Sequence, residues 1–498
     1  MSKIKFSLRG QSRAIRDQKK VLQKLLSTAF ATEFGVKYGF FDILNEADMK
    51  EAFRHRVPVH TYNDMAVWWE EARKGKRDVT WKGIIRHFAL SSGTSEGASK
   101  YIPVSKQMIR AIQRSSLKQY ASILKDKDVP ASVFSHSSLM MGSSTNLKYS
   151  NGHLEGDLSG IVTSRIPLWF EAFAKPGVQT RKMPWRDKIM AIAGQAKEWD
   201  ISMIGGVPAW IIMLFEEINE RYGVKSIHEI WPNLKVYFHG GVAIAPYLSS
   251  LRSYFTEEVF LFETYLASEG FFAYQSRLHA EGMKLIANNG IYFEFIPFTE
   301  ENFDEDGNLR SRFPQTHHVE EIVEGQEYAM LISTCAGAWR YLIGDTVRFQ
   351  SLKHMEINIT GRTKHYLSLC QEHLSVDNMN QALSETAAAF GVHCQEYCVA
   401  GRKLDSGFAH EWYVGIDREV SVVQFTATLD EKLKEINDDY KTERDYALKQ
   451  VTVRLLPNEV FVDFLESQGK QGAQVKFPRV LKGEQYNRWN QFLAKREI

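Results

Sequence analysis

Small hydroxyl residues and glycines are concentrated at residues 91–103, which read SSGTSEGASKYIP. Hydroxyl groups, a backbone freed by glycine and a lysine can together turn several donors and one positive charge toward an anion. The residues that could contact a phosphate in this way are Ser91, Ser92, Gly93, Thr94, Ser95, Gly97 and Lys100. The spacing is not the Walker pattern, in which a lysine directly follows the second glycine. By itself the stretch therefore fits either a phosphate site or a plain surface loop.

A second group of polar residues follows a strand-forming run, in the segment ETYLASEG at 263–270. Ligand-binding groups in open α/β sheets lie at the carboxyl ends of strands, which is where this group would be. Glu269 could bind Mg²⁺, a cation that takes one or two carboxylates together with phosphate oxygens. A solvated glutamate after a strand is the alternative.

An acidic residue at a turn is the third feature, in the segment AWRYLIGDTVRF at 338–349. Asp345 follows a glycine between two strand-like runs. A carboxylate placed there can accept hydrogen bonds from both hydroxyl groups of a ribose. The Gly-Asp pair is also common in ordinary turns, in which the aspartate bonds its own backbone.

The elements that would position these residues can be predicted from hydrophobic spacing. Apolar residues recur at helical intervals in the segments 13–45, 104–125 and 208–222. Short β-rich runs, each bounded by Gly, Pro, Asn or Asp, lie at 235–241, 258–268, 291–298 and 328–334. We therefore expect α/β layers, with some antiparallel strands around residues 290–350.

The character of the chain changes after about residue 360. We expect a patterned helix at 379–390, strands near 394–401 and 410–415, and a charged helix at 429–450. This change predicts a separate, smaller α+β domain. The charged helix fits a solvated face of that domain better than a regulatory element.

The composition is that of an ordinary globular protein, with 44% hydrophobic and 24% charged residues. Lys and Arg number 62 and Asp and Glu 60, a balance that argues against nucleic acid or an acidic membrane surface as the main partner. The apolar run at 201–215 is shorter than the roughly 20 residues of a membrane span. We expect it to form a loop and then a buried helix from Pro208.

The N-terminal sequence MSKIKFSLRG lacks the apolar core of a signal peptide, so we expect a cytoplasmic protein. Its four cysteines would then be free thiols. The segment HCQEYC at 393–398 matches no common zinc spacing and fits a strand with two buried thiols.

The three polar segments, in this order, resemble the adenylate-forming superfamily, and most closely its auxin-responsive family of acyl acid amido synthetases. That family conjugates plant hormones such as jasmonate and indoleacetate to amino acids, and it also has bacterial members. The segment 91–103 resembles the family's hydroxyl-rich phosphate loop with its trailing K-Y-I-P. YLASE resembles its Y-x-S-S-E motif, with Ala267 in place of a hydroxyl residue, and YLIGDTV its Y-R-x-G-D-x-V segment, with Leu342 in place of arginine. YFEFIP at 292–297 and QVKFPRV at 474–480 extend the resemblance over essentially the whole chain.

The resemblance implies a fold of two domains. Residues 1–361 would form a large ATP- and acyl-binding domain of α/β layers with a distorted β-barrel, and residues 362–498 a small mobile α+β lid. A hinge near 362–366, with Arg362 and Lys364, would let the lid rotate between two half-reactions.

The resemblance also implies roles for individual residues, with ATP and Mg²⁺ as cofactors. The loop 91–97 would hold the β- and γ-phosphates with Lys100 nearby, Glu269 would bind Mg²⁺, and Ser268 would contact the α-phosphate. The remaining assignments are Tyr265 stacked on adenine, Gly240, Gly241 and Val242 beside the adenine, Asp345 with Arg362 on the ribose, and Lys476 at the α-phosphate during adenylation.

The activity implied is adenylation of a carboxylic acid followed by transfer of the acyl group to the amine of an amino acid. No nucleic acid, membrane or obligatory protein partner is expected. A ligase that passes the acyl group to CoA or another thiol is the first alternative, and a degenerate nucleotide-binding protein is the second. The sequence identifies neither a general base nor the acyl pocket, although 140–147, 156–161 and the helix from Pro208 could form its walls.

Overall fold

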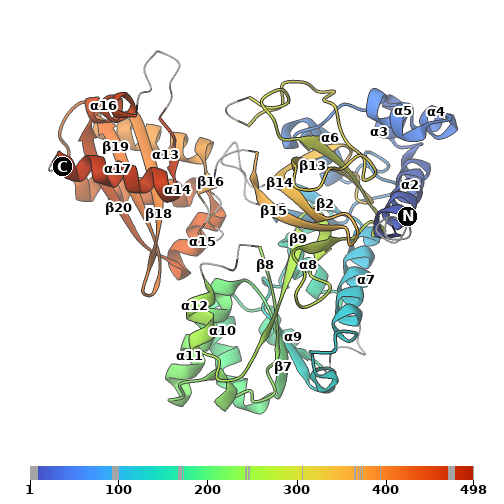
Figure 1. Ribbon diagram of the computed structural model, residues 1–498, viewed down its shortest axis with the longest axis horizontal. Coiled ribbons are helices and arrows are strands. Elements are labelled where there is room, and N and C mark those ends of the chain that lie inside the picture. Colours follow the sequence, from blue (N-terminus) through green and yellow to red (C-terminus); the bar gives the residue numbers. More distant parts are fainter. Residues whose placement is uncertain are drawn as a thin grey trace, which may run out of the picture. The chain divides into compact units, whose positions relative to one another are not determined.

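The computed structural model describes residues 9–91, 100–166, 171, 173–241, 244, 247–304, 307–363, 366–367, 369–370, 372, 374–392, 394–468 and 477–496. The chain divides into two compact units (Figure 1). One unit contains Met1–Ser91 and Lys100–Thr363, and the other contains Lys364–Ile498.

The first unit opens with a group of helices. These are α2 (Arg9–Ala29), α3 (Glu33–Lys37), α4 (Phe40–Asn45), α5 (Met49–Arg56) and α6 (Tyr62–Arg73). The apolar side chains at helical spacing in α2, among them Leu22, Leu25 and Leu26, are buried as expected. The single helix predicted over 13–45 is instead three, because Thr32 caps a new helix by accepting a hydrogen bond from the Gly35 backbone N–H.

A small four-stranded sheet, in the order β2-β1-β5-β4, follows these helices. Its strands are β1 (His87–Ser91), β2 (Lys100–Val104), β4 (Lys148–Ser150) and β5 (His153–Gly156). β1 and β2 are antiparallel, and their register places Ser91 opposite Lys100. The residues that flank the predicted phosphate loop are therefore neighbours in one ladder.

The main sheet has eleven strands in the order β12-β13-β14-β15-β11-β10-β9-β8-β7-β3-β6. Their bounds are β3 (Ser137–Met140), β6 (Ala174–Lys175), β7 (Ile201–Gly205), β8 (Val236–Gly240), β9 (Phe260–Ala267), β10 (Gly270–Tyr274), β11 (Met283–Leu285), β12 (Ile291–Pro297), β13 (Glu327–Thr334), β14 (Tyr341–Ser351) and β15 (Glu356–Arg362). Strands β6, β3, β7, β8 and β9 run parallel, and the strands from β9 through β10, β11 and β15 to β12 pair antiparallel. Among the described strands this sheet ends at β12 and β6 without closing, so the expected distorted barrel is not found.

Helices accompany the parallel strands, as α/β layering requires. They are α7 (Lys106–Ile123), α8 (Leu158–Thr163), α9 (Val178–Arg181), α10 (Trp185–Gln195), α11 (Pro208–Tyr222) and α12 (Leu248–Ser253), with 3₁₀ turns at Ala131–Ser135, Ala196–Glu198 and Ile227–Glu229. Helix α11 begins at Pro208 as predicted. The preceding segment was predicted as a loop, and this is wrong, because residues 201–205 form the fully buried strand β7. A continuous apolar run is typical of a parallel strand buried on both faces.

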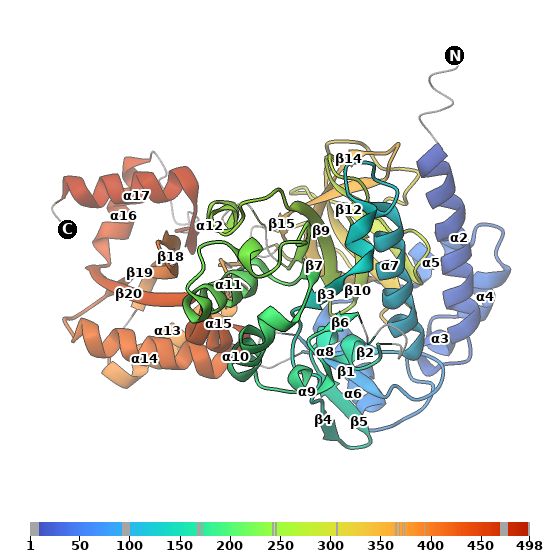
Figure 2. The same cartoon turned by 90° about the horizontal axis from the view of Figure 1, so that it is seen from below.

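The second unit has a four-stranded sheet in the order β20-β19-β18-β21 and a two-stranded ladder of β16 and β17. Its elements are β16 (Tyr366–Leu367), β17 (Leu374–Ser375), α13 (Val376–Phe390), β18 (Cys394–Leu404), β19 (Gly407–Ile416), α14 (Val422–Ile436), α15 (Asp438–Tyr446), β20 (Leu448–Pro457), α16 (Glu459–Ser467), β21 (Val480–Leu481) and α17 (Gly483–Lys495). Figure 2 shows the sheet between α16 and α17 on one face and α13 and α14 on the other. On the first face Trp489 lies at the centre of an aromatic cluster with Phe461, Phe464 and Phe477.

The charged helix predicted over 429–450 is also corrected. The helix ends at Ile436, and Asn437 caps the separate helix α15 by accepting a hydrogen bond from the Tyr440 backbone N–H. Strand β20 then begins at Leu448. All four cysteines are free, as expected.

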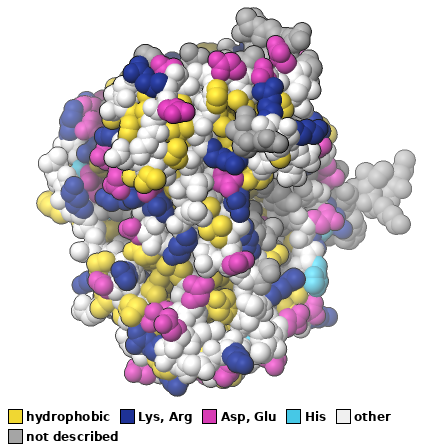
Figure 3. Space-filling view, turned by 90° about the vertical axis from the view of Figure 1, so that its left-hand side faces the viewer, with side chains coloured by type: hydrophobic (Ala, Val, Ile, Leu, Met, Phe, Trp, Pro, Cys, Tyr) yellow, Lys and Arg dark blue, Asp and Glu magenta, His cyan; other side chains and the backbone are white. Residues whose placement is uncertain are grey.

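The charged side chains at the surface and the apolar character of the helices are both as the composition predicts. Figure 3 shows Lys and Arg side chains intermixed with Asp and Glu on the face that it presents. Within the part of the chain that the structure describes, no helix combines the length and the apolar character needed to cross a membrane.

Candidate active site

Three of the predicted site residues, which lie on β9, β14 and β15 of the main sheet, are joined by direct contacts. The Tyr265 hydroxyl on β9 donates a hydrogen bond to Asp345 Oδ2 on β14 at 2.5 Å. The Arg362 Nε atom lies 3.0 Å from Asp345 Oδ1, because the ladder of β14 and β15 pairs these two residues. Asp345 is only 9% exposed, so its charge is compensated by hydrogen bonding and by the guanidinium rather than by bulk water.

Ser268 and Glu269 form the tight turn that joins β9 to β10, directly after the strand that carries Tyr265. Glu269 is 9% exposed. Burial raises the pKa of its carboxyl group and Asp345 raises it further, whereas Lys100 and Arg362 lower it. Asp345 and both cations therefore lie within electrostatic range of Glu269.

The turn at Glu269 depends on the glycine that follows it. Gly270 has a φ of +148°, and a Cβ atom there would come within 2.7 Å of Ile291 Cδ1. A side chain at this position would push the turn away from β12.

Lys100 begins β2, and its ammonium group lies over the ring of Tyr62 on helix α6, 5.2 Å from the ring centroid. The Tyr62 hydroxyl accepts a hydrogen bond of 2.9 Å from the backbone N–H of Tyr101. Sequence reasoning did not identify Tyr62. It is separated from the phosphate-loop segment by about 30 residues, and no local pattern connects the two.

The predicted glycine loop at the end of β8 is only partly described. A Cβ atom on Gly240 would lie 2.4 Å from the Thr264 carbonyl oxygen, so glycine is needed for β8 and β9 to approach here. Gly241 has a φ of +83°, which favours glycine as well. The preceding residue, His239, is buried, and this lowers its pKa to about 4, so the imidazole is neutral at physiological pH.

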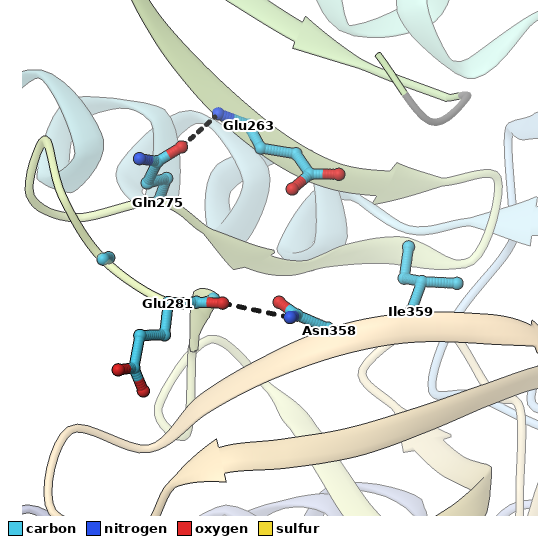
Figure 4. Close-up of a pocket in the computed structure, with 7 residues that line it drawn as sticks. Glu263, Gln275, Glu281, Asn358 and Ile359 are labelled. Carbon is cyan, nitrogen blue, oxygen red and sulfur yellow. Dashed lines mark hydrogen bonds between the residues drawn. The ribbon is translucent and has the colours of Figure 1, made fainter. Parts of the chain in front are cut away.

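A cavity of about 260 Å³ lies beside Glu263, which is nearer the start of β9 than Tyr265. Figure 4 shows residues that line it. It is lined by Glu263, Gln275, Ala280, Glu281, Gly282, Asn358 and Ile359. Glu263 and Tyr265 point to the same face of β9, about 7 Å apart along the strand. The cavity therefore continues the same face of the sheet from the group around Asp345.

The polar side chains that line the cavity differ in their hydrogen bonds and in the direction in which they point. The Asn358 side chain donates a hydrogen bond to the Glu281 carbonyl, and Gln275 Oε1 accepts one from the Glu263 backbone N–H. The Glu263 side chain lies across from Ile359 of β15, whereas the Glu281 carboxylate points away (Figure 4). Burial raises the pKa of the Glu263 carboxyl group. Sequence reasoning missed Glu263, although it stands two residues before Tyr265 in the same motif.

Several predicted site residues lie outside the described residues. They are Ser92, Gly93, Thr94, Ser95, Gly97, Val242, Lys364 and Lys476. Their roles, like the other role assignments and the hinge near 362–366, stay predictions.

Comparison with protein families gives three matches in chain order. The GH3 family N-terminal domain matches residues 4–176 and 156–260, the GH3 family central domain matches 284–362, and the GH3 family C-terminal domain matches 377–485.

Curated relatives carry related names. The chain is 22% identical to jasmonoyl–L-amino acid synthetase JAR4 of Nicotiana attenuata, over 71% of this chain and 72% of that protein. It is 23% identical to indole-3-acetic acid-amido synthetase GH3.4 of Arabidopsis thaliana, over 93% of this chain and 88% of that protein.

Solved structures show the same fold. GH3.15 acyl acid amido synthetase matches with a TM-score of 0.59 and 16% identity, covering 99% of this chain and 94% of that one. A 2-hydroxyisobutyryl-CoA ligase in complex with 2-HIB-AMP and CoA matches with a TM-score of 0.60 and 14% identity, covering 97% and 93%. Because the three family domains together match most of the sequence in their proper order, the chain belongs to the GH3 family.

Proposed function

We propose that this protein is an ATP-dependent acyl acid amido synthetase. It would react a carboxylic acid with ATP to give an acyl-adenylate and pyrophosphate, and then transfer the acyl group to the amine of an amino acid with release of AMP. The observation that carries this proposal is the group formed by Tyr265, Asp345 and Arg362, with Glu269 and Lys100 in electrostatic range. It occurs in a family whose curated members include amido synthetases for jasmonate and indole-3-acetic acid.

The positions of these residues relative to β9 suggest how ATP lies. Glu269 follows the carboxyl end of β9, and Lys100, at the start of β2, lies within its electrostatic range, so positive charge is available there for the polyphosphate. Asp345 is next, and its carboxylate oxygens can each accept more than one hydrogen bond, which suits the two ribose hydroxyls. The cavity at Glu263 comes last and would receive the base.

This arrangement changes the role proposed for Tyr265. Its ring is 5% exposed and packs edge-on against Phe272 at 4.9 Å, while its hydroxyl is used by Asp345. We therefore propose that Tyr265 holds the ribose-binding carboxylate rather than stacking on adenine.

Glu263 would select the base. A protonated carboxylic acid offers one donor and one acceptor side by side. Adenine presents the complementary pair on its Watson–Crick edge, an amino donor beside a ring nitrogen acceptor. The raised pKa of Glu263 favours this neutral form, and Ile359 gives the cavity an apolar wall.

The residues around Glu269 fit a magnesium ion. Its carboxylate is a hard oxygen ligand that burial leaves costly to ionise, so a cation there would relieve an existing energetic cost. Mg²⁺, when bound, supplies charge neutralisation for the phosphate oxygens. Lys100 and Arg362 contribute fixed positive charge within electrostatic range of this carboxylate.

Adenylation needs mainly positioning and charge compensation, because the protein itself forms no covalent bond to the phosphates. Asp345 would orient the ribose, Lys100 and the loop 91–97 would hold the β- and γ-phosphates, and Ser268 and Lys476 would contact the α-phosphate. Rotation of the second unit about a hinge near 362–366 would then admit the amine. The four free thiols and the use of ATP fit a cytoplasmic setting.

Pyrophosphate exchange tests the first half-reaction. The protein is incubated with ATP, labelled pyrophosphate, Mg²⁺ and a panel of carboxylic acids, and acid-dependent exchange is the expected result. Hydroxylamine traps the acyl-adenylate formed, and amino acids are then compared with CoA as acceptors. Absence of exchange with every acid contradicts the adenylating function, whereas transfer to CoA alone identifies the thioester-forming alternative.

A further inference from the structure

Helix α6 holds the start of β2, where Lys100 lies. Tyr62, the first residue of α6, carries the Lys100 ammonium over its ring and accepts the Tyr101 backbone N–H. These two contacts fix different parts of the same segment. The hydrogen bond fixes the backbone next to the lysine, and the ring face attracts the cation at the end of its side chain.

The last residue of α6 holds the same segment from the opposite end of the helix. The Arg73 guanidinium lies 3.8 Å from the centroid of the Tyr101 ring, and its Nε atom lies 3.4 Å from Glu155 Oε1 on β5. The beginning of β2 is thus attached to both ends of a twelve-residue helix.

Helix α6 also contacts the strand that carries Asp345. The Trp69 ring lies between Tyr62 and Tyr341, at centroid distances of 5.9 and 5.5 Å. Its indole N–H donates a hydrogen bond to the Gly337 carbonyl just before β14. Tyr341 is the first residue of β14, four residues before Asp345. The rings of Tyr62, Trp69 and Tyr341 therefore connect Lys100 to the strand of Asp345.

We propose that Tyr62 is a positioning residue for polyphosphate binding, which acts through Lys100. The proposal rests on the ATP-binding function proposed above. A lysine side chain has many rotamers and loses that freedom when it binds a phosphate. Tyr62 restricts the ammonium to the region over its ring, within electrostatic range of Glu269. The ligand addressed is the triphosphate part of the nucleotide, and the acid and the amine are unaffected.

The test is a double-mutant cycle between Tyr62 and Lys100. Binding of inorganic tripolyphosphate is measured by calorimetry, and the KM for ATP is measured by pyrophosphate exchange. Tyr62→Leu removes both the ring and the hydroxyl. We expect it to weaken tripolyphosphate binding about fivefold and to raise the KM for ATP about fivefold. Tyr62→Phe keeps the ring and should cost about twofold, through the Tyr101 hydrogen bond. In a Lys100→Ala background, Tyr62→Leu should have less than about a twofold further effect.

Tyr222→Phe is the matched control. Its hydroxyl donates to the Ala193 and Gly194 carbonyls beside α11, so its removal should leave both quantities unchanged. If Tyr62→Leu does not fold, as judged by thermal unfolding, the cycle is run with Tyr62→Met, which also removes the ring from the Lys100 ammonium. The KM for the carboxylic acid should stay constant in every variant, which a general loss of structure would not allow.

The outcomes separate the two proposals. Equal weakening by the Tyr62 variant with and without Lys100, no weakening at all, or failure of the unaltered protein to bind tripolyphosphate each overturns the role of Tyr62. Tripolyphosphate binding with the expected cycle, but no exchange with any acid, supports the role of Tyr62 and contradicts the adenylating function.

Discussion

Asp345 is held in place by two neighbours, and each can be altered separately. We expect Asp345→Ala and Glu269→Ala each to reduce adenylation more than tenfold, because loss of a charged hydrogen-bond partner costs roughly 1.5–3 kcal/mol. Tyr265→Phe removes only the hydroxyl that orients Asp345, so its effect should be smaller and should fall mainly on the KM for ATP. Pyrophosphate exchange measures all three. Unchanged exchange in both alanine variants would remove these residues from the site.

The proposed contact between Glu263 and adenine predicts that the KM for ATP depends on pH. Its pKa is raised by burial, and the protonated form is the one complementary to adenine. The KM for ATP should therefore increase as the pH rises through that pKa, since the acid loses its proton and hence its donor. Glu263→Gln carries a permanent donor and acceptor, and it should bind ATP without this pH dependence. Glu263→Ala should reduce the preference for ATP over GTP.

The comparison of Glu263→Gln with the unaltered protein also serves as the control, because the phosphates of ATP titrate equally in both. If the KM for ATP varied with pH identically in the two proteins, Glu263 would not be the residue that binds adenine.

The turn into β14 is secured by a buried ion pair between Arg340 and Glu294, which are 0% and 1% exposed. Arg340 also donates hydrogen bonds to the Arg54 and Val57 carbonyls, so it attaches α5 and β12 to the start of β14. Arg340→Ala would leave Glu294 buried without its counter-charge, which typically costs about 3–5 kcal/mol. We expect a matching loss in the free energy of unfolding, measured with urea.

The double variant Glu294→Leu with Arg340→Met provides the contrast. It replaces both charges by apolar groups of similar size, and it should be less destabilised than Arg340→Ala alone. Equal destabilisation would mean that the carbonyl contacts of Arg340, rather than its charge pairing, stabilise this turn.

At the scale of elements, the sequence correctly predicted those helices whose bounds are set by local sequence patterns. Helix α11 begins at the proline that suits a first turn, and α7 follows the apolar spacing of its sequence. Strand β7 was missed because it is buried between β8 and β3, and the four apolar or small residues before a Gly-Gly pair carry no periodicity that separates strand from loop. The helix over 429–450 was predicted too long because a capping asparagine in a charged, helix-like sequence gives a weak signal.

For the site, the order of motifs along the chain predicted the family correctly, and Tyr265, Asp345 and Arg362 prove to be in contact. Tyr62 and the aromatic contacts of α6 could not be predicted, because they depend on which helix packs against β2. The stacking role predicted for Tyr265 rests on motif resemblance, which does not report the direction of a side chain on its strand, and our proposal for Tyr265 differs from it for that reason.

At the scale of the whole molecule, the two half-reactions can be separated experimentally. We predict from the sequence that Lys476→Ala slows adenylation more than it slows acyl transfer from a supplied acyl-adenylate. The physical reason is that a lysine acts as a mobile point charge, needed where the α-phosphate gains negative charge. Exchange and single-turnover transfer are compared in the same preparation. Equal loss in both steps would contradict a role confined to adenylation.

The pairing of Ser91 with Lys100 has a further consequence, for engineering and for divergence among relatives. The ladder of β1 and β2 closes a connection of eight residues whose two ends are already fixed by the sheet. Doubling the length of such a connection costs only about 0.6 kcal/mol in closure entropy. A longer connection between β1 and β2 should therefore cost little stability. We expect that its length can be doubled without unfolding the first unit, provided that Ser91 and Lys100 at its two ends are kept.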